Sequence, residues 1–361
     1  MPLVKLDGVA VANIVKRDGI AIANIAKIGG VEVSTVKVAM DDYYQTTGFL
    51  GNATGSRAIT TGINLSANDG MLWSHNRDNL GNAALTVAGF NFISPMNSAN
   101  HFALAHTNAG VASSTHFTSF DTDGVTLNSG TDFNTDAENY ALHSFRNHAD
   151  FMRCFEYTGD GTANRNLAHG LNKTPGFYVI HANSGGIWYA YHSDGWPSST
   201  PQTSYSFRFN TTGNPNALNI YGTGGVPDGT NIHINGIAVN TDTTVYTCFA
   251  FVHDTDADGV CQCGGAVMNG SGNYSNTSLG WKPQMMIIGH EGGSPYHVFE
   301  NKVRDTSNPL SVWGNTNGAE DNDDPSTSES GSQTVDFNAD GFDMDGFQFG
   351  ESYWWVAIRE A

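Results

Sequence analysis

The stretch VYTCFAFV (residues 245–252) is apolar at nearly every position and is rich in β-branched and aromatic residues. A strand that faces water on one side alternates between apolar and polar residues, whereas a strand buried on both faces is apolar throughout. Two stretches of the same kind, NYALHSF (residues 139–145) and SYWWVAI (residues 352–358), lie at similar distances before and after it. We therefore expect three central strands, each in the middle of a β-sheet.

The segments before these strands also repeat along the 361-residue chain. Each repeat opens with a Gly- and Asn-rich turn followed by a short apolar strand. It closes with a turn-rich phrase that precedes the long apolar stretch described above. A period of about one hundred residues is the size of a domain and not of a solenoid repeat. The opening phrases start at Leu50, Thr158 and Met268, and the closing strands carry Tyr140, Tyr246 and Tyr353 at equivalent positions.

Within each repeat, strand-like segments alternate with turn signals, and no segment shows a sustained helical stripe. Abundant Gly, Asn, Ser and Thr with only 14% charged residues also favour strands and turns. The pattern predicts an all-β protein with three tandem antiparallel β-sandwich, jelly-roll-like domains. We place the domains at residues 42–150, 151–253 and 254–361, after a short β-repeat arm at residues 1–41.

The arm consists of an eleven-residue phrase in three versions. DGVAVANIVKR starts at Asp7, DGIAIANIAKI at Asp18 and a looser GGVEVSTVKVA at Gly29. The Asp-Gly and Gly-Gly dipeptides favour tight hairpin turns. The residues between them are apolar on both faces of a strand, and forty residues cannot bury both faces alone. The sequence predicts an attachment or oligomerisation arm, and the alternative is a small hairpin folded back on the body.

The charge distribution separates the arm from the body. The chain has a net charge of −19, which argues against nucleic-acid binding, because phosphate recognition requires clustered Lys and Arg. Residues 1–40 carry five basic and three acidic side chains, so the rest of the chain carries −21. No apolar run is long enough to predict membrane insertion, and the first residues do not resemble a signal peptide. We expect synthesis in a cytoplasm.

The sequence contains no recognisable catalytic constellation. It lacks a G-x-S-x-G elbow, a phosphate loop and an H-E-x-x-H motif, and its thirteen histidines show no metal-ligand spacing. Four cysteines are too few for a disulfide framework, and we expect reduced, structural thiols. The chain is not expected to be an enzyme. Its 35 acidic residues leave a glycosidase carboxylate pair as the alternative.

The phrase DTDADG is the strongest local signal for a metal. Asp254, Asp256 and Asp258, followed by Gly259, match the first half of a calcium-binding loop, in which alternate side chains converge on one cation. The twelfth position is Gly265 instead of the usual Glu. Calcium is the one cofactor that the sequence suggests, and an acidic turn at a domain junction is the alternative.

Three tryptophans are candidates for binding glycans, because an exposed indole can stack on the apolar face of a sugar. Trp188 and Trp196 lie in the aromatic segment IWYAYHSDGW, and Trp313 stands alone in an expected loop. Alternation along the strand buries either Trp188 or Tyr189, so core packing is the alternative for that pair. Trp196, beside Pro197, is the better candidate for exposure.

Two segments resemble proteins of tailed bacteriophages. NIAKIGGVEV (residues 24–33) resembles the N-terminal repeats of virion structural proteins from cyanophages and other marine phages. YTGDGTANRNLAHGLNKTPGFYVIHANSGGIWYAYH (residues 157–192) resembles a phage-encoded domain of uncharacterised function that occurs in tandem in virion and tail-fibre proteins. The match is carried by residues 157–162, 169–177 and 246–249. The third repeat has Lys282-Pro283 in place of Thr-Pro, and the first has neither.

The resemblance implies a structural component of a phage virion, assembled in the host cytoplasm, with no known catalytic residues. We expect a tail-fibre or baseplate-associated protein involved in host attachment. Residues 1–41 would bind other virion proteins. The chain would also form a homo-oligomer, with a trimer favoured, and would bind a host-surface glycan. The alternatives are a capsid decoration protein or head fibre, and a tail-borne carbohydrate-active enzyme.

Overall fold

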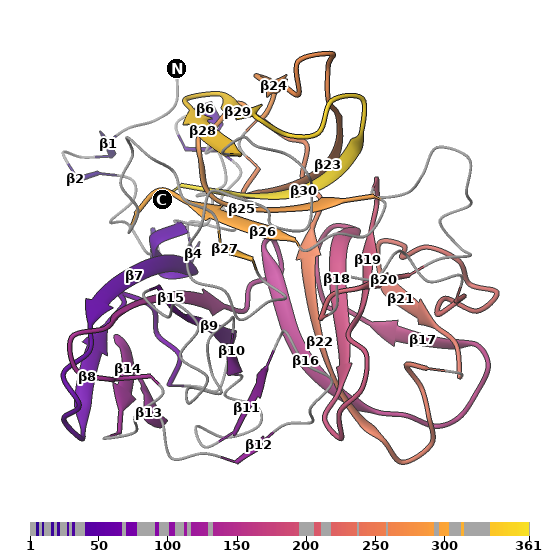
Figure 1. Cartoon of the computed structure of the whole chain (residues 1–361), viewed down its shortest axis with the longest axis horizontal. Helices are drawn as coiled ribbons and strands as arrows, with labels where there is room; N and C mark the ends of the chain where they lie inside the picture. The colour runs from indigo at the N-terminus through magenta and orange to yellow at the C-terminus, as the bar shows by residue number, and fades with distance from the viewer. Residues whose placement is uncertain are drawn as a thin grey trace. The chain divides into compact units, whose positions relative to one another are not determined.

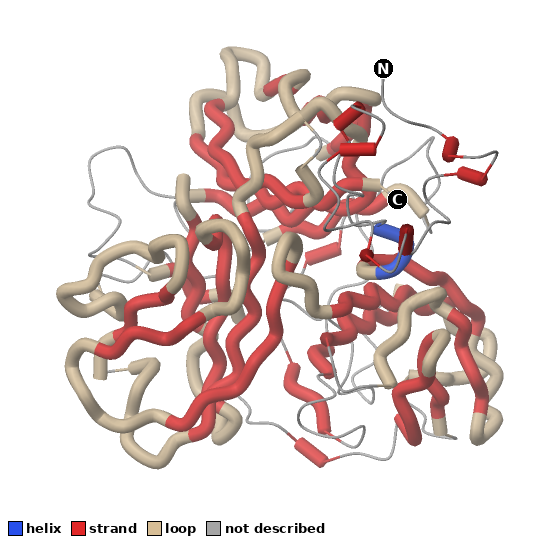
Figure 2. Tube along the Cα trace, turned by 180° about the vertical axis from the view of Figure 1, so that it is seen from behind, coloured by secondary structure: helices blue, strands red, loops and turns tan. Residues whose placement is uncertain are grey.

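The computed structural model describes most of the body and short segments of the arm. The described ranges are 40–66, 70–77, 117–128, 133–194, 206–210, 218–236, 238–257, 259–291, 296–302 and 333–360, together with the backbone of short strands within 5–32, 91–113 and 312–313. These residues form an all-β protein, as the sequence predicts, and strands dominate the trace in Figure 2. The one helical element among them is a short 3₁₀ turn, Met40–Asp42.

The middle unit has the clearest architecture, with a five-stranded antiparallel sheet and a two-stranded sheet (Figure 1). The order of the large sheet is β16-β22-β18-β19-β20, and the small sheet pairs β17 with β21. The strands are β16 (Met152–Thr158), β17 (Arg165–Ala168), β18 (Pro175–Ala182), β19 (Tyr189–His192), β20 (Phe207–Arg208), β21 (Asn231–Ile234) and β22 (Val245–Val252).

The first unit repeats this plan. Its large sheet has the order β12-β11-β10-β9-β15-β7, and its small sheet has the order β13-β14-β8. The strands are β7 (Tyr44–Leu50), β8 (Arg57–Thr60), β9 (Gly70–Asn76), β10 (Asn91–Ile93), β11 (His101–Leu104), β12 (Ala112–Ser113), β13 (Phe117–Asp121), β14 (Gly124–Leu127) and β15 (Asn139–Arg146).

The third unit follows the same order once more. Its large sheet is β23-β30-β25-β26-β27, and its small sheet is β24-β29-β28. The strands are β23 (Cys261–Val267), β24 (Tyr274–Asn276), β25 (Pro283–His290), β26 (His297–Glu300), β27 (Val312–Trp313), β28 (Thr334–Asn338), β29 (Gly341–Asp345) and β30 (Ser352–Arg359).

The three apolar closing stretches are central strands, as predicted. In each unit the closing strand lies between the first strand and the strand of the following hairpin: β15 between β7 and β9, β22 between β16 and β18, and β30 between β23 and β25. Seven of the eight residues of β22 are buried, and only Val245 at its start is exposed. Continuous apolar sequence therefore corresponds to burial on both faces of the sheet.

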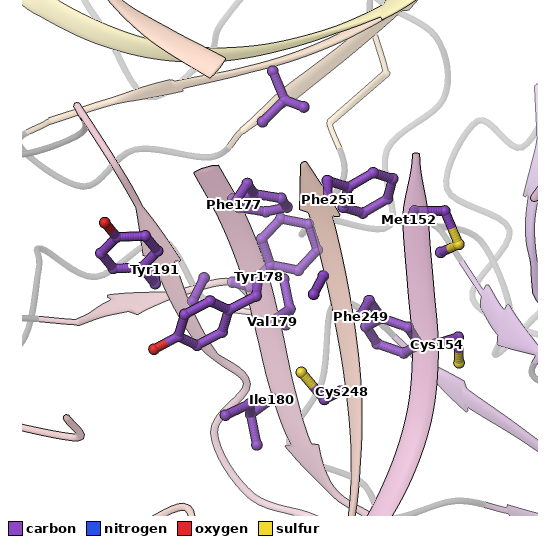
Figure 3. Packing of buried hydrophobic residues seen from close by; sticks show 14 of the residues in the cluster. Met152, Cys154, Phe177, Tyr178, Val179, Ile180, Tyr191, Cys248, Phe249 and Phe251 are labelled. Carbon is purple, nitrogen blue, oxygen red and sulfur yellow. The ribbon is translucent and has the colours of Figure 1, made fainter. Parts of the chain in front are cut away.

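A shared aromatic core connects the three units. The Phe209 ring stacks on Trp73 of the first unit, with centroids 6.0 Å apart, and on Tyr296 of the third, at 4.0 Å. Phe177 stacks on Trp354 at 5.7 Å. Figure 3 shows Phe177 with Phe251 and Met152, side chains of β18, β22 and β16 in this core. Residues 40–361 form one compact unit, so three separately folded domains stay a prediction.

The described segments of the arm form three hairpins, and each hairpin pairs two strands of two residues. They are β1 (Lys5–Leu6) with β2 (Val9–Ala10), β3 (Lys16–Arg17) with β4 (Ile20–Ala21), and β5 (Lys27–Ile28) with β6 (Val31–Glu32). In the sequence, the Asp-Gly or Gly-Gly dipeptide that predicts a turn lies between the two paired strands of each hairpin. The longer apolar segments between the hairpins lie outside the described residues. Residues 1–39 form a compact unit of their own.

Candidate functional site

The exposed large apolar side chains of the described residues lie at one end of the large sheets. The first strand of each unit ends there, opposite the start of the closing strand: Leu50 opposite Asn139, Thr158 opposite Val245, and Val267 opposite Ser352. Leu50 and Val245 each belong to a different unit, whereas Val267 and Phe349 both belong to the third. Exposed apolar residues in a group mark interaction sites more often than single ones do. The exposed fractions are 53% for Leu50, 39% for Val245, 66% for Val267 and 70% for Phe349.

The turn that carries Phe349 is held in place by hydrogen bonds. The backbone N–H of Gln348 donates to the Tyr353 hydroxyl at 3.3 Å, and the N–H of Gly350 donates to the carbonyl of Met268 at 3.2 Å. Gly350 has a φ of +76°, a conformation that glycine adopts without strain. The neighbouring Phe347 ring is buried, so one aromatic anchors the turn while Phe349 faces solvent.

The fold does not require an aromatic residue at position 349. Tyr140 and Tyr246 each accept a backbone N–H from the residue five positions earlier, as Tyr353 does. Aligned on these tyrosines, Phe349 corresponds to Asp136 in the first unit and Asp242 in the middle unit. Phe349 belongs to no recognisable sequence motif, and its signal lies in a comparison of QFGESY with TDAENY and TDTTVY.

Two glutamates belong to the same sheet end as Phe349 and Val267. The Glu291 N–H donates to the carbonyl of Ser352 at 2.9 Å, and Glu351 accepts a hydrogen bond from His290 Nε2 at 3.3 Å. Burial, with the nearby charge of Glu351, raises the pKa of Glu291 to about 7. Such a pair attracts cationic groups, and a carboxyl group protonated near neutral pH can also act as a general acid.

The predicted calcium loop holds a lysine. Lys173 Nζ donates to Asp254 Oδ1 at 2.5 Å and to Asp256 Oδ2 at 2.8 Å, so its ammonium lies between the two carboxylates. Burial lowers the pKa of Lys173, but the hydrogen bonds and charges of the two aspartates outweigh burial and raise it overall. Asp254 Oδ1 also accepts the N–H of Asp256 at 3.0 Å.

The Lys173 contact joins the middle unit to the connection that leads into the third unit. This connection is the acidic junction turn that the sequence suggests as the alternative to a calcium loop. Asp258, the third predicted ligand, lies outside the described residues. Among the residues that the structure describes, no group of three or more His, Cys, Asp or Glu side chains could hold a metal ion. A calcium ion at Asp254 and Asp256 would have to displace Lys173.

The structure places two of the three candidate glycan-binding tryptophans. Trp188 is fully buried, and its ring lies 4.2 Å from His181 and packs on Phe249, so the glycan prediction for Trp188 is wrong. Alternation places Trp188 in the core and leaves Tyr189 half-buried. Trp313 is not in a loop, because its backbone forms part of β27 and pairs with His297. Trp196 lies outside the described residues.

Several histidines have structural hydrogen bonds. The Nδ1 atoms of His148, His169 and His192 each accept the backbone N–H two residues later, at 3.0–3.1 Å. Nε2 of His169 bonds the carbonyl of Asp228, and Nε2 of His192 bonds that of Trp355, which fixes a neutral tautomer. Burial lowers the pKa of all three imidazoles.

The four cysteines are buried free thiols. Burial raises the pKa of Cys248 and Cys263 well above the usual value, which disfavours the reactive thiolate. Their burial agrees with a structural role, and their reduced state stays a prediction.

Residues within and beside the segment that carries the phage resemblance in the middle unit have structural contacts. Arg165 donates to Asn240 Oδ1 at 3.1 Å, and its guanidinium lies 5.5 Å from the Tyr157 ring centre. Asp160 Oδ1 accepts the Thr162 hydroxyl at 2.6 Å and the Thr162 N–H at 2.9 Å, and these bonds lower the pKa of Asp160 to about 2. The first unit repeats the arrangement, with Arg57 donating to Asn134 Oδ1, also at 3.1 Å, and lying over Phe49.

No described helix is long and apolar enough to span a membrane.

Comparison with known proteins identifies a family for this chain. The sequence matches no curated protein. The model of one family, described as a domain of unknown function (DUF7483), matches residues 144–361, which contain the middle and third units and more than half of the chain. The chain belongs to the DUF7483 family.

Proposed function

We propose that this protein is a structural component of a phage virion, most consistent with a tail-fibre or baseplate-associated protein that contributes to host attachment. The observation that carries the proposal is the resemblance of residues 24–33 and 157–192 to virion proteins of tailed phages. The shared aromatic core, in which Phe209 packs against Trp73 and Tyr296 and connects all three repeats, supports a structural role. A body built in this way suits a component that has to hold a surface at a fixed position in a particle.

The chemistry of the described residues supports a structural role. The three imidazoles of His148, His169 and His192 are engaged with backbone groups, and the thiols are buried. Arg57 and Arg165 stack on aromatic rings and hold loops together. Groups with saturated hydrogen bonds inside a sandwich stabilise the fold and are poorly placed to react.

The arm supports a role in assembly. Its hairpins repeat every eleven residues, and isolated two-stranded hairpins of this length have little stability in water. Contact with another surface would stabilise them. We propose that residues 1–41 bind other virion proteins or further copies of the chain.

Electron microscopy of intact particles tests the proposal directly. Gold-labelled antibodies against the body should mark the tail tip or baseplate of particles that carry this protein. Labelling of the head would support the alternative of a capsid decoration protein or head fibre, and absence of the chain from purified particles would contradict the virion assignment. A chain that lacks residues 1–41 should be lost from particles, while its circular dichroism stays that of a β-protein.

A second candidate function, a tail-borne carbohydrate-active enzyme, is favoured by one observation. Glu291, with its pKa near 7, lies beside the carboxylate of Glu351, and glycosidases separate the pKa values of two carboxyl groups in this way. The test is depolymerisation of host polysaccharide by the intact chain. Activity that disappears in Glu291→Gln, with the fold retained, would favour the enzyme over a purely structural protein.

A further inference from the structure

The third unit exposes a surface of mixed apolar and acidic character, here called the Phe349 patch: Phe349, Val267, Glu291 and Glu351. Strand register places the backbones of these residues at one end of the large sheet. Val267 lies opposite Ser352 at the end of β23, and the N–H of Glu291, just after β25, donates to the carbonyl of the same Ser352. Phe349 and Glu351 belong to the turn that leads into β30.

The combination of Phe349 and Val267 distinguishes the third unit. Their positions hold Asp242 and Thr158 in the middle unit and Asp136 and Leu50 in the first. An exposed phenylalanine in a fixed turn loses little conformational entropy on binding, and such side chains act as anchors at protein interfaces. The carboxyl groups beside it favour a partner that combines apolar and cationic side chains.

The arm of this chain has that composition. Residues 1–39 carry five basic and three acidic side chains among apolar residues, whereas the rest of the chain carries −21. In the three hairpins Lys5, Lys16 and Lys27 occupy the same register position, opposite Ala10, Ala21 and Glu32. The arm therefore offers a cation at regular intervals and is complementary in charge to the body.

We propose that the Phe349 patch binds the basic N-terminal arm of a second copy of this chain. Each copy has one arm and one patch, so the contact is head-to-tail and either closes into a ring or continues as a filament. The contact covers the apolar side chains of the patch and stabilises the short hairpins of the arm. The inference rests on the assembly role proposed for residues 1–41 and adds the surface that receives them.

Association of the full-length chain tests the inference, measured by sedimentation equilibrium over a concentration series. The wild-type chain should self-associate, and added salt should weaken the association because the contact includes exposed charges. Phe349→Asp, which introduces the residue found in the sister turns, should raise the dissociation constant about thirtyfold, the effect of losing an interface anchor. Thr243→Asp, which adds the same charge to the equivalent turn of the middle unit, is the matched control and should leave association unchanged.

A charge exchange identifies the two sides of the contact. A patch variant (Glu291→Lys with Glu351→Lys) and an arm variant (Lys5→Glu, Lys16→Glu and Lys27→Glu) should each associate weakly, whereas a mixture of the two should associate like the wild type. Photo-crosslinking from a benzoylphenylalanine at position 349, in a mixture of ¹⁴N and ¹⁵N chains, should give peptides that join labelled to unlabelled chains.

Three results would overturn the inference: a wild-type chain that stays monomeric, equal association of the Phe349→Asp and control variants, or crosslinks confined to single chains. None of them bears on whether the protein is found in particles, so the virion assignment is judged separately by microscopy.

Discussion

The hydroxyl of Tyr246 accepts a hydrogen bond from the backbone N–H of Thr241, at 3.1 Å, across the turn that leads into β22. Tyr140 accepts the N–H of Thr135 at the same distance in the first unit. The tyrosines that mark the repeat in the sequence therefore fix the start of the closing strand. The ring of Tyr246 also stacks on Tyr157 of the adjacent strand, with centroids 5.1 Å apart.

We predict that Tyr246→Phe lowers the free energy of unfolding by about 1 to 2 kcal/mol, because the Thr241 N–H loses its acceptor while the ring packing remains. Urea denaturation followed by tryptophan fluorescence measures the change. Tyr178→Phe is the matched control in the same sheet, because the Tyr178 hydroxyl is buried without a hydrogen-bond partner in the structure. Its removal should be neutral or stabilising, and equal losses in both variants would contradict the assigned role.

Two adjacent glycines of β23 should differ in their tolerance of a methyl group. A Cβ on Gly264 would lie 2.3 Å from the indole ring of Trp355, which is opposite it in the sheet, whereas a Cβ on Gly265 would meet its nearest neighbour at 3.5 Å. We expect Gly264→Ala to lower the free energy of unfolding by about 1 to 3 kcal/mol. Gly265→Ala should change it by less than about 0.5 kcal/mol. Similar values for the two variants would show that Trp355 can move away.

Local sequence pattern predicted the parts of the fold that depend on neighbouring residues. The apolar run of β22 is central, and antiparallel pairs flank the positions of the Asp-Gly and Gly-Gly dipeptides in the arm. Alternation also showed that one member of the Trp188–Tyr189 pair has to be buried, but not which one. That choice depends on His181 and Phe249, which come from other strands.

The shared core and the candidate site could not be predicted in this way, because both depend on distant parts of the chain. Phe209 follows a two-residue strand with no marked pattern, yet it packs between Trp73 and Tyr296. The sequence DTDADG matches a calcium loop through its own residues only, and the lysine that binds Asp254 and Asp256 lies about eighty positions earlier. Phe349 stands out only after the three turns have been aligned.

The Lys173 contact leads to a prediction about calcium. Calcium or a chelator should leave the melting temperature of the wild-type chain unchanged, because Lys173 already neutralises Asp254 and Asp256. Lys173→Ala should lower the free energy of unfolding by about 1 to 2 kcal/mol, since Asp254 is buried and loses its partner while Asp256 remains in water. Calcium should then restore part of that loss. Stabilisation of the wild-type chain by calcium in differential scanning calorimetry would instead mean that the ion displaces the lysine.

Acid should weaken the contact between the middle and third units through His192. This imidazole is fully buried, its Nδ1 accepts the N–H of Asp194 and its Nε2 donates to the carbonyl of Trp355. Burial lowers the pKa of His192 to about 3, well below the usual 6.5. Between these two pH values the unfolded chain binds a proton that the native chain does not bind. The contribution of His192 to the free energy of unfolding is therefore fully present above pH 6.5. It falls as the pH decreases, by about 1.4 kcal/mol per pH unit for one such group.

His192→Gln tests this dependence, because glutamine cannot take up a proton and keeps an amide able to donate to Trp355. The variant should be less stable than the wild type at pH 7.5, but the slope of its unfolding free energy between pH 6 and pH 5 should be smaller by about 1 kcal/mol per pH unit. His148 and His169, whose pKa values are also lowered, retain their share of the slope in both proteins. Urea denaturation at a series of pH values gives both slopes, and parallel curves would assign the acid sensitivity to groups other than His192.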